Sequence, residues 1–119
     1  MIITAHGGTP ESLERASTIA KRLRGSNIPA FQDTYGWIEY RQGNYETAVE
    51  YLSQAAAGLP SEPVVQAHLA LAYAGLGREQ DARSAFDTAV SLAGGTELPE
   101  ITEARATLAA LAEADAAKP

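Results

Sequence analysis

Residues whose side chains could support catalysis are few in this 119-residue sequence, and they stand far apart. The two histidines, His6 and His68, are distant from each other, and neither has a carboxylate at a spacing typical of metal ligands. Neither histidine is spaced to build a nucleophilic triad with Ser12, Ser17, Ser53 or Ser84. The sequence contains no cysteine, which excludes thiol catalysis, disulfides and cysteine-ligated zinc. We therefore interpret His68 as a packed or surface residue with no ligand role.

Two pairs of carboxylates have the spacing of one helical turn, Glu11 with Glu14 and Glu100 with Glu103. Such pairs can act in general acid–base catalysis when an apolar pocket shifts the pKa of one member. Here both pairs lie on polar faces, so we interpret them as solvated. Segment 7–10 lacks the Gly-Lys-Ser/Thr ending and the preceding strand of a phosphate-binding loop. The sequence therefore predicts a protein that is not an enzyme and that holds neither a metal nor a cofactor.

Charge and apolar composition exclude two further classes of protein. There are 9 Lys and Arg against 15 Asp and Glu, a net charge of −6, whereas nucleic-acid binders normally carry a basic excess. No apolar run approaches the roughly 20 residues that a transmembrane helix needs. We therefore predict neither nucleic-acid binding nor direct insertion into a membrane. Alanine dominates the apolar residues, which indicates helices that pack closely through small side chains.

A repeat with a period of 34 residues runs through the middle of the sequence. When Gly43 is aligned with Gly77, further pairs fall at the same offset: Gly36 with Ala70, Ala48 with Ala82, Leu52 with Phe86, and Ala55 with Ala89. A small residue at position 36 or 70 would let two helices approach closely, and each aligned glycine would form the turn between them. The pattern predicts two helix–turn–helix units.

The blocks 35–48 and 69–82 resemble the tetratricopeptide repeat (TPR) family. That family has a 34-residue helix–turn–helix unit with a small residue where the helices cross, a glycine in the turn and a closing proline. Pro60 stands at the position of that proline in the first unit, and Gly94 replaces it in the second. The resemblance is close over residues 29–95 and looser in the flanks. It implies an all-α solenoid of antiparallel helix pairs.

We predict one TPR domain over residues 1–119, with a partial repeat at 1–28, whole repeats at 29–62 and 63–96, a capping helix at 97–114 and a frayed tail at 115–119. The expected helices are 10–24, 29–42, 45–57, 62–76, 79–93 and 99–114. A cap is needed because the last unit of an array otherwise exposes its inner face. We expect the cap to bury Ile101, Ala104, Leu108, Leu111 and Ala112 and to turn Glu100, Glu103, Arg105 and Glu113 outward.

The N-terminal flank is typical of the second helix of a preceding unit. Thr9 and Pro10 form a helix start and Gly25 a stop, so residues 2–6 would be the end of a first helix that is mostly missing. We therefore expect a C-terminal fragment of a longer repeat protein, with a short native protein as the alternative. Segments 33–37 and 40–43 are also similar to the C-terminal repeats of larger bacterial TPR proteins, some of them lipoproteins linked to exopolysaccharide export.

The resemblance to the TPR family implies a concave groove, lined by the first helix of each unit, that holds a partner segment. The groove-facing positions are Ala30, Asp33, Trp37, Tyr40 and Arg41 in the first unit, and Val64, Ala67, Leu71, Ala74 and Gly75 in the second. The first set is aromatic with one acid and one base, and the second is small and apolar. Such a groove would suit an extended or helical segment with apolar side chains and one polar anchor. Alternatively, Trp37 and Tyr40 pack against the preceding unit or under the last helix.

Glu39 is the one residue that departs from the repeat in an unfavourable way. It matches Tyr73, a core aromatic in the second unit, and a carboxylate buried there would be costly. We expect Glu39 to reach water or to pair with a base such as Arg41 or Arg22.

The predicted function is that of a non-catalytic scaffold or adaptor for protein–protein interaction. The family variant that clamps acidic C-terminal peptides is not expected, because its lysine and asparagine positions are replaced here by Asp33, Trp37, Ala67 and Leu71. Two alternatives stay open. One is self-assembly by dimerisation or helix swapping, favoured by Ile2, Ile3, Ala16 and Ile19. The other is an accessory domain of a longer enzyme or export-system protein. The compartment is also open between bacterial cytoplasm and periplasm.

Overall fold

The computed structural model describes residues 27–116, which contain five helices and no β-strand. The helices are α2 (Pro29–Arg41), α3 (Tyr45–Gly58), α4 (Pro63–Gly75), α5 (Glu79–Ala93) and α6 (Pro99–Ala116). Their bounds agree with the sequence prediction to within one or two residues at each end. The predicted helix over 10–24 and the partial repeat at 1–28 lie outside the described residues, apart from the last two positions.

The two helix pairs repeat at the offset found in the sequence. The helices α2 and α4 both place a proline in the first turn, where its missing N–H costs no hydrogen bond. The turn in each pair ends on a glycine with positive φ, 84° at Gly43 and 77° at Gly77. The next residue donates its backbone N–H back to the helix, from Asn44 to Glu39 at 2.9 Å and from Arg78 to Tyr73 at 3.0 Å. These are the same helix-ending motif in both units, which explains why glycine stands at both positions.

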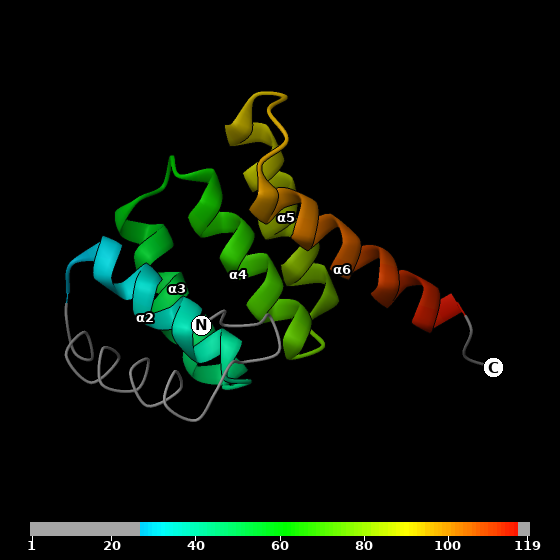
Figure 1. Ribbon diagram of the computed structural model, residues 1–119, viewed down its shortest axis with the longest axis horizontal. Coiled ribbons are helices and arrows are strands. Elements are labelled where there is room, and N and C mark those ends of the chain that lie inside the picture. The colour runs from blue at the N-terminus through cyan, green and yellow to red at the C-terminus, as the bar shows by residue number, and fades with distance from the viewer. Residues whose placement is uncertain (1–26, 117–119) are drawn as a thin grey trace, which may run out of the picture.

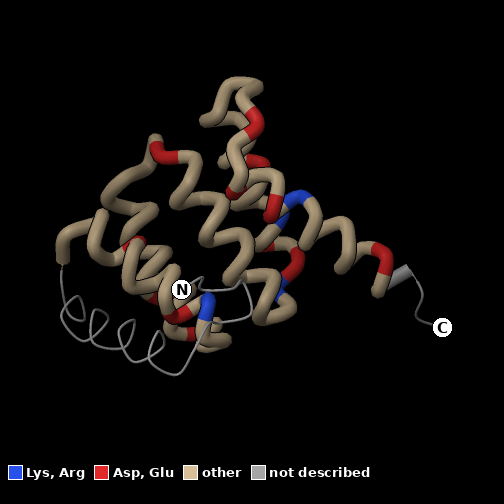
Figure 2. Tube along the Cα trace, viewed as in Figure 1, with Lys and Arg blue, Asp and Glu red and all other residues tan. Residues whose placement is uncertain are grey.

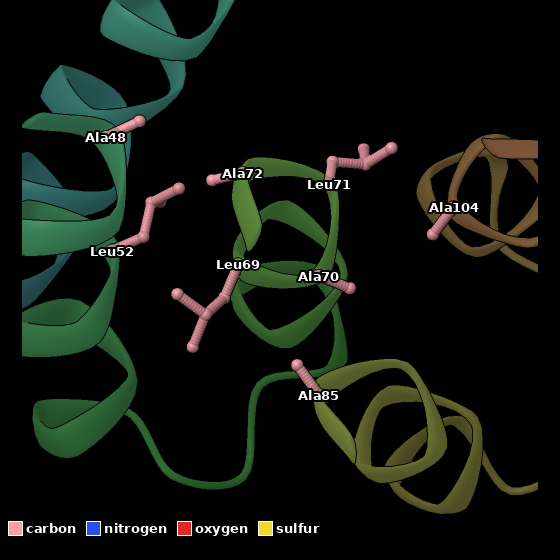
Figure 3. Close-up of a cluster of buried hydrophobic side chains, with 8 residues drawn as sticks. All are labelled: Ala48, Leu52, Leu69, Ala70, Leu71, Ala72, Ala85 and Ala104. Carbon is pink, nitrogen blue, oxygen red and sulfur yellow. The ribbon is translucent and has the colours of Figure 1, made fainter. Parts of the chain in front are cut away.

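The helix α4 is the centre of the molecule. It contacts each of the other four described helices, and eight of its thirteen residues are buried. Figure 3 shows Ala72 of α4 pointing toward Leu52 of α3, while Leu71 points toward Ala104 of α6. The helices α2, α4 and α6 follow one another along one side of the molecule, and α3 and α5 pack behind them (Figure 1). A central helix surrounded in this way explains the nearly continuous apolar run of α4.

Small side chains stand at the helix crossings, as the repeat predicts. The four alanines at matched positions are fully inaccessible to solvent: Ala48, Ala55, Ala82 and Ala89. Gly36 is more tightly enclosed still, because a Cβ atom built there would lie 2.7 Å from Cγ of Leu52. The matched position in the second unit tolerates a methyl group, since Ala70 is fully buried without disturbing its helix pair.

The helix α6 packs against α4 and α5 and buries the first three residues of its predicted apolar stripe, but the prediction that Ala112 is buried is wrong. Ile101, Ala104 and Leu108 are buried against α4 and α5, whereas Leu111 is half-buried and Ala112 is exposed. Two charged residues expected to turn outward are accessible to solvent, as predicted, and they also make specific contacts. Arg105 lies over the ring of Phe86 at 5.2 Å and donates a hydrogen bond to Glu97, and Glu103 pairs with Arg41 of α2. The cap is therefore tied to its neighbours by charged groups at its edges as well as by its apolar stripe.

Glu39 has a partner that the sequence analysis did not consider. Its Oε2 atom accepts a hydrogen bond of 2.8 Å from Nδ2 of Asn44, the residue that follows the turn glycine. In the second unit the matched pair is Tyr73 and Arg78, whose guanidinium lies 4.8 Å from the ring centroid. In both units, side chains at the same two matched positions therefore contact each other across the turn. The contact is a hydrogen bond in the first unit and a cation–π contact in the second.

Acidic residues occur on four of the five described helices, all except α4, and arginines are rare among them (Figure 2). In residues 27–116, four arginines face thirteen acidic residues, a net charge of −9. Within this described part of the chain, no helix is both long and apolar enough to span a bilayer.

Candidate functional site

The helix α2 places four chemically distinct side chains along one stripe. Successive members of the stripe are four, three and one residues apart, so they share a face over two helical turns. They are Asp33, Trp37, Tyr40 and Arg41. This face is turned toward α4 and α6, because side chains from those helices contact it. All four residues belong to the predicted partner-binding set.

Trp37 is the centre of the stripe and carries two stacked rings. The imidazole of His68, on α4, lies 4.0 Å from the indole centroid with an interplanar angle of 20°. The ring of Tyr40 lies 4.9 Å away at 12°. Trp37 is half-buried and packs on the central core, so part of its surface remains open to solvent. Stacking of this kind fixes the indole in one orientation.

Asp33 and His68 form a second link between the two units. Oδ1 of Asp33 accepts a hydrogen bond of 2.8 Å from Nδ1 of His68. The side chains are only 19% and 9% exposed, so this contact is more sheltered than any of the arginine–carboxylate pairs in residues 27–116. The hydrogen bond holds the imidazole flat against Trp37, so α2 and α4 are joined by a polar contact and an aromatic contact at one place.

Arg41 connects the stripe to the capping helix. Its guanidinium carbon lies 5.0 Å from the Trp37 ring centroid, and Nη1 lies 3.7 Å from Oε2 of Glu103 on α6. Three helices therefore contribute to one continuous surface. We call it the aromatic face and define it by Asp33, Trp37, Tyr40, Arg41, His68 and Glu103.

Tyr40 offers a direct test of this arrangement. Burial raises the pKa of its hydroxyl above the ordinary value of 10.0, and the negative charge of Glu103 raises it further. Because the folded pKa is the higher one, the stabilising contribution of neutral Tyr40 is complete below pH 10 and is lost as the pH rises through the folded pKa. We predict that Glu103→Gln lowers the pKa of Tyr40, since the negative charge that raises it is removed while the lowering effect of Arg41 remains. The measurement is an ultraviolet titration of tyrosinate, with Tyr40→Phe to assign the transition.

Glu113→Gln is the matched control for this titration, because Glu113 is an exposed carboxylate on the same helix. It should leave the pKa of Tyr40 where it is. A Glu103→Gln variant with an unchanged Tyr40 transition would show that Glu103 does not lie against Tyr40 in solution.

The second predicted set is placed differently from the first. Ala67, Leu71 and Ala74 are buried, with exposed fractions of 0%, 1% and 8%, and they pack in clusters with residues of α5 and α6. These side chains offer a partner no open surface in this structure. Val64 is half-buried, and Ala30 and Gly75 are exposed. The accessible part of the predicted set is therefore mainly the stripe on α2.

Two members of the aromatic face were not in the predicted set. His68 follows Ala67 directly, and the sequence analysis gave it no ligand role; Glu103 was expected to point outward. The repeat could have indicated the role of His68, because the first helices of successive units lie side by side. A histidine on the second of them could therefore meet the acid and the aromatic on the first. Nothing in the sequence marked Glu103 in a comparable way.

Other surface features in the described residues do not build a site. One hollow lies between α3 and the α4–α5 turn, and it is lined by Glu46, Thr47, Val49, Glu50, Leu76 and Arg78. Another lies between α5 and α6, and it is lined by Arg83, Phe86, Asp87, Arg105, Leu108 and Ala109. The arginines in both are already paired with carboxylates. No group of three or more potential metal ligands occurs in the part of the chain that the structure describes.

The five packed helices and their 34-residue repeat define a helical repeat protein. The profile of the family described as "Tetratricopeptide repeat" matches residues 39–98, half of the chain. The chain belongs to this family, whose repeats are generally protein–protein interaction modules. No curated protein and no solved structure matches the chain.

Proposed function

We propose that this chain is a non-catalytic interaction module that binds a segment of a partner protein on the aromatic face. The observation that carries the proposal is the stacked, half-buried Trp37 with Tyr40 and Arg41 beside it. Tryptophan and tyrosine are among the residue types that contribute most to binding at protein interfaces, and the contact with Arg41 shows that the indole can hold a cation. A large aromatic that stays partly open to water is a surface that a partner can cover.

Preorganisation supports the same proposal. The indole of Trp37 is fixed by His68, and His68 is fixed by Asp33, so binding would not have to order these side chains. An interface that is already ordered loses less conformational entropy on association. The acidic surface makes a nucleic-acid partner unfavourable, and Asp33 makes a clamp for an acidic C-terminal peptide unfavourable.

The test is a comparison of peptide binding before and after removal of the indole. Peptides are selected from a displayed random library on the wild-type protein, and their affinities are then measured for Trp37→Ala. We expect Trp37→Ala to weaken binding by about thirtyfold or more, which corresponds to the roughly 2 kcal/mol typical of an interface hot spot. The matched control is Leu92→Ala, because Leu92 is another large apolar side chain that is accessible to solvent, 37% exposed, but it lies on α5.

Circular dichroism and thermal unfolding of both variants show whether the fold is retained. Equal affinity for wild type and Trp37→Ala, with the fold intact, would place the binding surface elsewhere. A larger loss in Leu92→Ala than in Trp37→Ala would point to the opposite side of the molecule.

A further inference from the structure

The aromatic face already holds a cation, and that cation is its own Arg41. The guanidinium contacts the two groups that bind positive charge best in proteins, an indole ring at 5.0 Å and a carboxylate at 3.7 Å. The side chains of Arg41 and Glu103 are 54% and 41% exposed, so solvent reaches both of them. Another positively charged side chain could approach the same two groups from solution.

The contact of Arg41 differs from those of the other three described arginines. Arg78 pairs with Asp81, Arg83 with Glu79 and Arg105 with Glu97, in each case within eight residues along the chain. The bridge from Arg41 to Glu103 instead joins α2 to α6, and at 3.7 Å it is the longest of the four. Exposed ion pairs at such distances are weak and are readily exchanged.

The charge of the described surface favours the binding of a positively charged segment. Residues 27–116 carry a net charge of −9, and every arginine among them is neutralised by a carboxylate. Glu100 lies one helical turn before Glu103 and adds a second half-exposed carboxylate to α6. A segment with lysine or arginine is therefore attracted to this surface, whereas an acidic segment is repelled.

We infer that Trp37 and Glu103 form a cation subsite, that Arg41 is its internal occupant, and that the partner segment inserts a lysine or arginine that displaces Arg41. This inference rests on the proposed function, since it names the chemistry of the partner at the same face. The displaced Arg41 remains in the last turn of α2, where a positive charge is favourable beside the free carbonyl groups. Displacement therefore leaves no buried charge behind.

Two substitutions should change the affinity for a cationic segment in opposite directions. Removing the internal occupant with Arg41→Gln should tighten the binding of a cationic segment, because the subsite is then empty. Removing the carboxylate with Glu103→Gln should weaken it. An exposed charge contact of this kind changes affinity by about twofold to fivefold. If Arg41 instead contacted an anionic partner group, the first of these effects would have the opposite sign.

Three synthetic peptides test these directions. They are an acetylated and amidated hexapeptide of alternating leucine and arginine, the same peptide with uncharged citrulline for arginine, and the same peptide with glutamate for arginine. Trp37 is the only tryptophan in the sequence, so its fluorescence reports binding at the face itself. Each peptide is titrated into wild type, Arg41→Gln and Glu103→Gln, with Arg78→Gln and Glu113→Gln as matched controls on exposed charges elsewhere.

We expect the arginine peptide to bind more tightly than the citrulline peptide by about fivefold or more, and the glutamate peptide to bind least. Arg41→Gln should improve the affinity for the arginine peptide and Glu103→Gln should reduce it, while both controls match wild type. No binding of the arginine peptide, equal binding of the citrulline form, or weaker binding to Arg41→Gln would each overturn the inference. The proposed function would survive these results if library-selected peptides still required Trp37.

Discussion

Replacing Ile101 with aspartate should lower the free energy of unfolding by at least about 3 kcal/mol. Ile101 is 1% exposed and is the first buried residue of α6, packed with Ala67 and Ala89. The substitution removes a large apolar side chain and leaves a carboxylate without a partner in the core. Urea denaturation followed by circular dichroism measures the loss.

An exposed position on the same helix supplies the control for this experiment. Ala110 is exposed on α6, so Ala110→Asp should change the free energy of unfolding by less than about 1 kcal/mol. If the two variants were equally stable, α6 would not be packed on α4 and α5 in solution. The burial of Ala67, Leu71 and Ala74 would then no longer hold, and these residues would return to the candidate binding surface.

Replacing Gly36 with valine should cost about 3 kcal/mol of unfolding free energy, because the new side chain has no room. Its Cβ would lie 2.7 Å from Cγ and 3.0 Å from Cδ2 of Leu52, which is itself fully buried. Leu52→Ala alone should also be destabilising, by about 2–5 kcal/mol, through the cavity that it leaves. In the double variant the valine can enter that cavity. We therefore expect the double variant to lose at least about 1 kcal/mol less than the sum of the two single variants.

Ala57→Val is the matched control for the Gly36 experiment, since Ala57 is exposed on α3 and the substitution introduces the same side chain. It should cost no more than the few tenths of a kcal/mol that reflect the helix propensity of valine. Additive losses in the double variant would mean that the two helices do not meet at Gly36 and Leu52.

The helix pairs could be predicted from the sequence because backbone geometry requires particular residues at fixed positions. A helix that ends in a left-handed turn needs glycine, which Gly43 and Gly77 supply at the same offset. A close helix crossing needs a small residue, which Gly36 and Ala70 supply. These requirements are local or involve one neighbouring helix, so the 34-residue pattern carries them.

The surface of the site depends on contacts between units, and the sequence pattern does not encode these as directly. Position 71 is groove-facing by the repeat, but α6 covers Leu71, because the last unit is followed by a cap. Trp37 contacts Tyr40 and Arg41 of its own helix and His68 of α4, and Arg41 in turn reaches Glu103 of α6. Long polar side chains such as these can reach several neighbours, and only the three-dimensional arrangement selects one of them.

The central claim is that a partner segment binds where α2, α4 and α6 meet, and chemical-shift mapping tests it most directly. The isotopically labelled protein is titrated with a peptide selected from the displayed library, and every backbone amide and the indole N–H of Trp37 are followed. We predict that the largest shifts cluster on Trp37, His68 and Glu103, with little change on the outward side of α5. Shifts concentrated around Val90 and Leu92 of α5, with the Trp37 indole unmoved, would contradict the account.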